Sequence, residues 1–306
     1  LADALRLCPE LVVVPPHYDL YEACSNALME LLKEYSPCVE QYSVDEAFCD
    51  MTGTAHLYGS PVAAANLMKD RIQQELGFTV NIGISTNKVL AKMASDFKKP
   101  NLVHTLFPEE IETKLWCLPV DELFYVGHAT KRKLHALGIH TIGELAKTDL
   151  DILRAHFKKF GQVIYAFANG IDMSVVSDEL PKNKGYGNST TIAFDVDRPD
   201  TAKMILLSLA ETVCSRLRAD NAMATVVAVG IVNSEFKHES HQMTLFSPTN
   251  ITNEVHRAAC ILFDELWDGS PIRKLGVHTG KVVYGVTERQ MNLFDMDRFE
   301  KFSKLD

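Results

Sequence analysis

The order of strands and helices predicted over residues 189–284 restricts this chain to few folds. The residue pattern predicts six elements in the order β-α-β-β-α-β. The expected elements are strand 189–196, helix 200–219, strand 223–234, strand 240–246, helix 250–267 and strand 272–284. This order is typical of a ferredoxin-like split sheet, with both helices on one face and the other face open. That fold serves many functions, so the order alone assigns none.

Two adjacent carboxylates, Asp45 and Glu46, lie in an otherwise apolar segment that we expect to be extended, residues 40–51. Acidic residues are disfavoured in strands and rarely buried without a partner. Neighbouring carboxylates repel unless a cation lies between them, and their hard oxygens suit Mg²⁺. The apolar neighbours Val44 and Phe48 indicate a strand of a covered sheet. We interpret the pair as a magnesium platform for phosphoryl transfer, with a solvated turn as the alternative.

Side chains of successive strand residues point to opposite faces. For Asp45 and Glu46 both to reach a metal, the strand must bend or end near them. We therefore expect a hairpin edge or a bulge at this point.

A second strand and a helix are predicted further along the chain. Residues 80–85 indicate a short strand, and residues 87–96 have apolar side chains at helical spacing. We expect the helix to stop at residues 98–101, Lys-Lys-Pro-Asn. Lysines near such a unit, opposite a carboxylate pair, are candidates for binding phosphates.

Composition is that of a globular chain with an acidic surface. With 306 residues, two or three domains are expected. The net charge of −9 argues against uniform coating of nucleic acid, but basic clusters allow local contact. No apolar run is long enough to span a membrane. The seven cysteines have no CxxC spacing, which indicates reduced thiols and a cytoplasmic protein.

Residues 102–172 are predicted to be mainly helical, and residues 118–145 have the shape of helix, hairpin and helix. Such a hairpin offers backbone N–H groups at a helix N-terminus to a DNA phosphate, and nearby cations can add phosphate contacts. A helical hairpin used only for packing is the alternative. The candidate DNA contacts are Gly127, Ala129, Lys131, Arg132 and Lys133.

Several motifs together resemble one family. Residues 42–48, Tyr-Ser-Val-Asp-Glu-Ala-Phe, and residues 83–101 look like the palm of the Y-family translesion DNA polymerases, and residues 4–9 and 17–21 also match. The closer likeness is to the bacterial UV-mutagenesis branch, and it covers nearly the whole chain. The resemblance implies a multi-domain α+β fold. Its expected parts are a partial palm with fingers (1–102), a thumb with a helix-hairpin-helix (103–177), a linker (178–188), a ferredoxin-like little finger (189–287) and a clamp-binding tail (288–306).

The resemblance also implies an activity. The intact protein would add deoxynucleotides to a primer–template past damaged bases, in an error-prone reaction that uses two Mg²⁺ ions. Asp45 would bridge both ions, and Glu46 would help hold the ion that activates the primer hydroxyl. Lys99 would bind the triphosphate. Lys92 is a further candidate, although a salt bridge on the helix surface explains it equally well.

The resemblance places the family's first catalytic aspartate several dozen residues before the segment that matches Leu1. We therefore expect that natural residues precede and follow this chain. Because two-metal chemistry needs carboxylates for both ions, we also expect that this chain alone does not extend a primer.

Residues 290–294, Gln-Met-Asn-Leu-Phe, resemble the pentapeptide with which bacterial polymerases bind the sliding clamp. In that resemblance Gln290 hydrogen-bonds in one pocket, and Leu293 and Phe294 fill another.

Two other classes of protein are alternatives. A non-catalytic scaffold that binds DNA and the clamp would be expected to lose Asp45 and Glu46. A helix-hairpin-helix glycosylase would use an Asp or Lys close behind its hairpin, for which Lys131 and Lys133 are nominal candidates. That class leaves the paired carboxylates unexplained.

Overall fold

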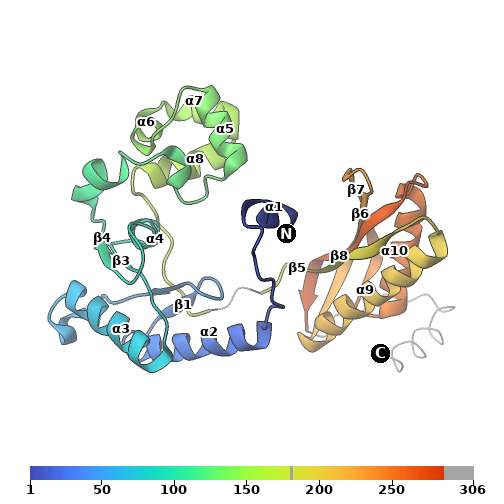
Figure 1. Cartoon of the computed structure of the whole chain (residues 1–306), viewed down its shortest axis with the longest axis horizontal. Coiled ribbons are helices and arrows are strands. Elements are labelled where there is room, and N and C mark those ends of the chain that lie inside the picture. The colour runs from blue at the N-terminus through green and yellow to red at the C-terminus, as the bar shows by residue number, and fades with distance from the viewer. Residues whose placement is uncertain (180–181, 286–306) are drawn as a thin grey trace. The chain divides into compact units, whose positions relative to one another are not determined.

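The computed structural model describes residues 1–179 and 182–285. The chain forms two compact units, Leu1–Leu180 and Pro181–Asp306 (Figure 1). Each unit has its own hydrophobic core. No helix among the described residues is both long enough and apolar enough to cross a bilayer.

The first part of unit 1 packs two long helices against a small hairpin. The helices are α2 (Tyr18–Lys33) and α3 (Pro61–Leu76), and the hairpin joins β1 (Val39–Gln41) to β2 (Ala47–Cys49). Local sequence defines the ends of α3. Ser60 accepts a hydrogen bond from the N–H of Ala63, and Gly77 ends the helix at a φ of 75°, where glycine is favoured.

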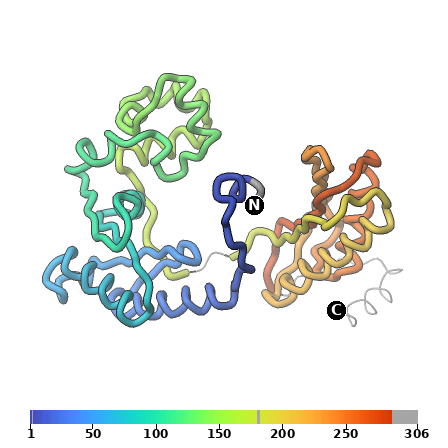
Figure 2. Tube along the Cα trace, viewed as in Figure 1, coloured from blue at the N-terminus to red at the C-terminus, as the bar shows by residue number. Residues whose placement is uncertain are grey.

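The segment before α2 is open to solvent. The short helix α1 (Ala2–Leu7) is followed by residues 8–17, which form neither helix nor strand (Figure 2). Val12, Val13 and Val14 are exposed in this segment.

The second part of unit 1 contains the predicted strand and helix. β3 (Ile82–Ile84) is followed by the predicted helix, α4 (Lys88–Ser95), whose N-cap Asn87 accepts the N–H of Leu90. β3 pairs in parallel with β4 (Val103–Thr105), a short strand that the helical prediction for residues 102–172 missed. The helix packs so closely on β3 that a Cβ at Gly83 would lie 1.9 Å from the carbonyl oxygen of Ala91.

Four helices complete unit 1, namely α5 (His128–Ala136), α6 (Ile142–Lys147), α7 (Leu150–Phe157) and α8 (Lys159–Ala168). The turn into α6 is specified locally, because Thr141 and Glu144 form a reciprocal capping box. The buried side chains of α4 and of these helices belong to one core. The four helices therefore pack with α4 around one shared core.

Unit 2 has the predicted β-α-β-β-α-β order. Its elements are β5 (Gly185–Val196), α9 (Pro199–Ala219), β6 (Ala222–Asn233), β7 (His238–Thr249), α10 (Thr252–Leu266) and β8 (Ile272–Tyr284). β5 begins before the expected residue 189, and β7 is longer than expected.

The sheet order is β5-β8-β6-β7, and every neighbouring pair is antiparallel. Because β8 lies between β5 and β6, those two strands run parallel to each other, which is the split βαβ arrangement. Helices α9 and α10 share one core with the inward side chains of the sheet (Figure 1). On the other face Ser189 pairs with Gly276, and Gly276 pairs with Gly230, so the side chains of this one row are small. Two residues further along β8 the same face carries the exposed imidazole of His278, beside Gly187.

Candidate active site

The acidic pair lies at the turn of the β1–β2 hairpin, as the need for a bend predicted. The N–H of Tyr42 donates to the carbonyl oxygen of Glu46 at 2.9 Å, and this bond closes the turn. Asp45 is exposed, and its Oδ1 accepts a hydrogen bond from Ser43 Oγ at 2.8 Å. The expectation of a covered strand at Val44 was wrong, because that side chain is 55% exposed. The alternative of a solvated turn describes the position of Val44 and Asp45 correctly.

Glu46 is connected to helix α4 by a chain of ion pairs. Lys92 Nζ lies 2.7 Å from Glu46 Oε1 and 2.8 Å from Asp96 Oδ2. Asp96 Oδ1 lies 2.9 Å from Lys99 Nζ. The order of charges is therefore acid, base, acid, base, from the turn to the end of α4.

This chain of charges changes the titration of its inner members. Burial alone would raise the pKa of Asp96, but hydrogen bonds from Lys92 and Lys99 outweigh it and lower that pKa. Burial alone would lower the pKa of Lys92, and its bonds to Asp96 and Glu46 raise it instead. Both groups are thus held in their charged forms.

The two candidate lysines differ in availability. Lys92 is only 13% exposed and is engaged by two carboxylates, so the salt-bridge interpretation describes it correctly here. Lys99 is 60% exposed and pairs with Asp96. An exposed ammonium group can exchange such a partner for a phosphate at little cost.

The donor set of the turn fits a divalent cation in part. Asp45 and Glu46 supply hard carboxylate oxygens, of which Mg²⁺ needs only one or two when phosphates complete its coordination. Within residues 1–179 and 182–285, no group of three or more His, Cys, Asp or Glu side chains could hold an ion. Two carboxylates could therefore hold Mg²⁺ only together with further ligands, such as the phosphates of a nucleotide.

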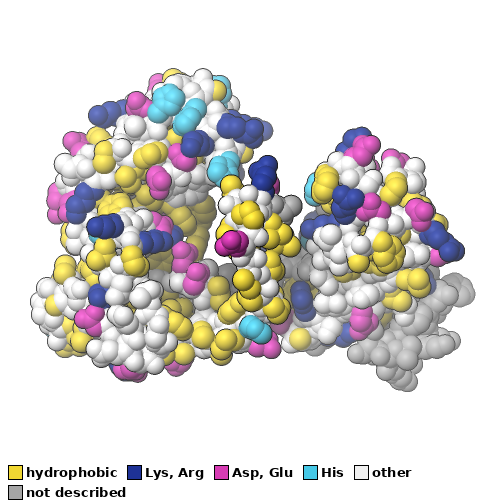
Figure 3. Space-filling view, viewed as in Figure 1, with side chains coloured by type: hydrophobic (Ala, Val, Ile, Leu, Met, Phe, Trp, Pro, Cys, Tyr) yellow, Lys and Arg dark blue, Asp and Glu magenta, His cyan; other side chains and the backbone are white. Residues whose placement is uncertain are grey.

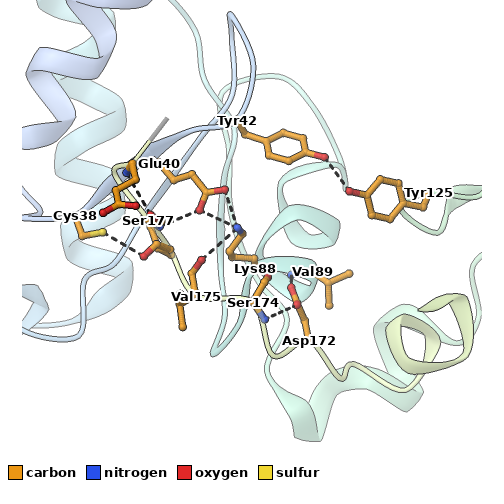
Figure 4. Close-up of polar contacts among 12 residues, drawn as sticks. Cys38, Glu40, Tyr42, Lys88, Val89, Tyr125, Asp172, Ser174, Val175 and Ser177 are labelled. Atoms are coloured by element: carbon orange, nitrogen blue, oxygen red, sulfur yellow. Dashed lines mark hydrogen bonds and ion pairs between the residues drawn. The ribbon is translucent and has the colours of Figure 1, made fainter. Parts of the chain in front are cut away.

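A second ion pair, which the sequence did not reveal, connects strand β1 of the same hairpin to the first residue of α4 (Figure 4). Lys88 Nζ lies 2.7 Å from Glu40 Oε1, and both side chains are largely buried. Glu40 Oε2 also accepts the N–H of Ser177, and Cys38 Sγ donates to the carbonyl oxygen of Val176. The segment after α8, residues 169–177, thus lies across β1, and we call it the strap. The residues involved lie far apart in sequence, so no local pattern indicates this contact.

The same strap also caps helix α4. Asp172 Oδ2 accepts the N–H of Val89 at 3.1 Å, and Asn87 Nδ2 donates to the carbonyl oxygen of Gly170 (Figure 4 shows Asp172 and Val89). A carboxylate at a helix N-terminus is favourable because it satisfies a backbone donor and complements the helix dipole.

An aromatic contact connects the acidic turn with the segment before α5. The hydroxyl oxygens of Tyr42 and Tyr125 lie 3.4 Å apart (Figure 4). This shared hydrogen bond, with partial burial, raises the pKa of Tyr42 to about 12. Tyr125 has a φ of 74°, a left-handed conformation that costs an L-residue about 1–2 kcal/mol. Its ring stacks on Phe124 and Phe167, with centroids 4.4 and 5.7 Å away.

The expected helix-hairpin-helix differs from the structure in its first helix. Residues before Gly127 do not form the expected first helix, since only Val120–Glu122 makes a single 3-10 turn. Gly127 is the N-cap of α5, and Gly138, with a φ of 77°, lies in the turn between α5 and α6. Val120 and Leu123 are both buried, and a single turn is enough to bury them.

The other DNA-contact candidates lie on or beside α5. Gly127 and Ala129 are exposed at its N-terminus, and Arg132 and Lys133 are exposed on its surface. Lys131 instead pairs with Asp121 at 2.7 Å, and its hydrogen bond lowers the pKa of that carboxyl. On the face of unit 1 shown in Figure 3, Lys and Arg side chains are interspersed with Asp and Glu.

The predicted clamp motif lies outside the described residues. Gln290, Leu293 and Phe294 follow the end of β8 at Tyr284. They stay predictions from the sequence.

Family models match most of this chain. The description of the first is "impB/mucB/samB family", over residues 1–96. A thumb model described as "DNA polymerase-iota, thumb domain" matches residues 121–172, and the impB/mucB/samB C-terminal domain matches residues 183–293.

Among curated proteins, DNA polymerase IV of Clostridium acetobutylicum is 43% identical over 295 residues, which are 96% of this chain and 74% of that protein. DNA polymerase IV 2 of Bacillus subtilis is 39% identical over 290 residues, 92% of this chain and 70% of that protein. Among solved structures, a Y-family DNA polymerase chimera of Dbh and Dpo4 has a TM-score of 0.78 at 22% identity, covering 93% of this chain and 82% of that one. The last likeness concerns the fold.

Proposed function

Because this chain belongs to the Y-family of DNA polymerases, we propose that the intact protein carries out template-directed, error-prone synthesis past damaged bases by a two-metal mechanism. The observation that carries the proposal is the chain of charges from the acidic turn along α4. Asp45 is exposed at the turn, Glu46 is tied to Lys92, and Lys99 is exposed at the other end. A magnesium–triphosphate substrate requires carboxylates to bind the magnesium ion and a cationic side chain to contact the phosphates.

In this proposal the residues of the turn bind the metal ion, and the lysines of α4 and of the segment after it hold the carboxylates and the triphosphate in position. Asp45 and Glu46 would hold Mg²⁺ together with the nucleotide phosphates. The chemistry that Mg²⁺ supplies at such a site is stabilisation of the attacking and leaving oxygens of an in-line displacement. Lys92 holds Glu46 in place, and Lys99 leaves Asp96 to contact the triphosphate. The Glu40–Lys88 ion pair holds the β1–β2 hairpin, which carries the two carboxylates, against α4.

DNA would be held by sequence-independent contacts. The N-terminus of α5 offers backbone N–H groups to a phosphate, and exposed Arg132 and Lys133 add charge. In unit 2, the row of small residues Ser189, Gly230 and Gly276 on the open sheet face would let a nucleic-acid backbone approach closely.

The tail would bind the bacterial sliding clamp through Gln290, Leu293 and Phe294. Such tethering raises the local concentration of the polymerase at a primer end. A polymerase with these partners would work in the cytoplasm, where bacterial DNA is replicated.

Primer extension by the full-length protein tests the proposal. With Mg²⁺ and four deoxynucleotides, it should extend primers on intact templates and on templates with an abasic site. Asp45→Asn should lower the insertion rate by about two to three orders of magnitude and leave primer–template affinity within about twofold. Asp151→Asn removes an exposed carboxylate of α7 and should act as wild type.

The same assay also tests the tail. Addition of a sliding clamp should stimulate synthesis by wild type, and the double variant Leu293→Ala, Phe294→Ala should lose only this stimulation. Full activity of Asp45→Asn would contradict the catalytic assignment. DNA and clamp binding without any synthesis would favour the non-catalytic scaffold.

A further inference from the structure

Two tyrosines form a direct contact between the acidic turn and the segment that leads into α5. Tyr42 and Tyr125 approach through their hydroxyls at 3.4 Å, and the ring of Tyr42 also packs against Phe48 and Phe124 (Figure 4 shows the two hydroxyls). The partners are 83 positions apart in sequence. The contact therefore belongs to the tertiary structure and to neither local element alone.

Each tyrosine lies next to a part of the proposed active site: Tyr42 at the acidic turn and Tyr125 just before the N-terminus of α5. The N–H of Tyr42 donates to the carbonyl oxygen of Glu46, so Tyr42 forms the base of the acidic turn. Tyr125 lies two residues before Gly127, the N-cap of α5. A movement of either ring would therefore shift the carboxylates relative to the phosphate-binding end of that helix.

Tyr125 is held in an unfavourable backbone conformation. Its φ of 74° is one that glycine adopts freely and an aromatic residue rarely does. The ring is nevertheless 53% exposed, so burial of the side chain explains little of its presence. What the ring does provide is a rigid stack on Phe124 and Phe167 that points its hydroxyl at Tyr42. Strain at such a position is typical of sites whose geometry serves function.

We propose that Tyr42 and Tyr125 are positioning residues that set the spacing between the acidic turn and the N-terminus of α5. A primer strand whose phosphate is bound at α5 then presents its 3′ end to Asp45 and Glu46. Neither tyrosine needs to touch the reacting atoms. The inference rests on the proposed function, since it assumes that a primer end is the ligand.

Removal of the hydroxyls, with both rings kept, isolates this role. The variants are Tyr42→Phe, Tyr125→Phe and the double variant in the full-length protein, with Tyr21→Phe as the control. Tyr21 is also half-exposed, and no hydrogen bond of its hydroxyl occurs among residues 1–179 and 182–285. All four variants keep the aromatic stacking of the fold.

Three quantities are measured for each variant, namely the insertion rate, the primer–template affinity and the fluorescence of a probe at the primer end. Single-turnover insertion should slow about 2- to 5-fold in each single Phe variant, and the double variant should be no slower, because both changes remove one shared contact. Primer–template affinity should stay within about twofold of wild type. The fluorescence of 2-aminopurine at the primer 3′ end, read without Mg²⁺ or nucleotide, should change equally in all three variants and not in Tyr21→Phe.

The possible failures are distinguishable. If wild type neither binds nor extends a primer, the proposed function fails. If wild type is active and the three variants match it in rate and fluorescence, or if the effects of the two single changes add, only the positioning role is overturned. If Tyr125→Phe behaves as wild type and Tyr125→Gly weakens DNA binding tenfold, the ring stacks on DNA directly and the inference is wrong.

Discussion

Asp96 occupies a central place among the charges of the candidate active site. It pairs with Lys92, which holds Glu46, and with Lys99, which is expected to meet the triphosphate. Apolar spacing in α4 identified the helix, but it did not indicate that Asp96 connects the two lysines. The two pairs of Asp96 are local, because its partners lie at (i,i+4) and (i,i+3) spacing, and only the pair of Lys92 with Glu46 depends on the approach of the hairpin.

The lowered pKa of Asp96 predicts a pH dependence of stability. A carboxyl whose pKa is lower in the folded than in the unfolded state stabilises the fold above its unfolded pKa of about 4. This stability is lost as the pH falls through the folded pKa. We expect the urea midpoint of unit 1 to fall more between about pH 5 and about pH 3 in wild type than in Asp96→Asn.

Asp3→Asn is the control for this measurement, because Asp3 and its partner Arg6 are both well exposed. Asp3→Asn should keep the wild-type pH dependence. Equal slopes in wild type and Asp96→Asn would show that the pairs with Lys92 and Lys99 do not stabilise the folded state.

At the scale of elements, the register between β3 and α4 determines where the lysines lie. A Cβ at Gly83 would lie 1.9 Å from the carbonyl oxygen of Ala91 and 2.5 Å from the backbone nitrogen of Ser95. Real contacts of this kind do not occur, so α4 would have to move away from the strand.

Gly83→Ala should therefore destabilise unit 1 by about 2–4 kcal/mol in urea unfolding, because overpacking forces the backbone apart. Gly53→Ala is the matched control, since no atom lies within 4 Å of the added Cβ. If both variants unfold at the same urea concentration, the close packing of α4 on β3 does not limit stability.

At the start of the thumb, the spacing of apolar residues is not enough to predict a helix. Val120 and Leu123 have helical spacing, yet the chain becomes extended at Leu123, where ψ is 131°. A single turn satisfies an apolar pair three residues apart, so the spacing could not distinguish a turn from a helix. The capping box at Thr141 and Glu144 is a stronger local signal, and there the helix α6 does begin.

At the scale of the whole molecule, the two units have separate cores. Phe263 is completely buried among side chains of unit 2, on helix α10. Phe263→Ala should lower the stability of unit 2 by about 3–5 kcal/mol. Hydrogen exchange should then accelerate in peptides of unit 2 and stay unchanged in peptides of unit 1.

Phe246→Ala is the control, because Phe246 is 83% exposed on β7. It should leave exchange in both units near wild type. Acceleration in both units of Phe263→Ala would mean that they unfold together, contrary to the independence of their cores.

Several features of this protein follow from its sequence alone. The β-α-β-β-α-β order, helix α4 with its Asn87 cap and the bend at Asp45 and Glu46 all arise from patterns within a few residues. Backbone geometry and the alternation of side chains operate at this range, so local patterns are sufficient.

Only the tertiary structure decided which charges and aromatic rings from distant parts of the chain meet at the site. Glu46 meets Lys92 across 46 positions, Tyr42 meets Tyr125 across 83, and Glu40 meets the N–H of Ser177 across 137. Such contacts exist because separate elements pack into one core, and the burial that brings them together has no direction along the chain.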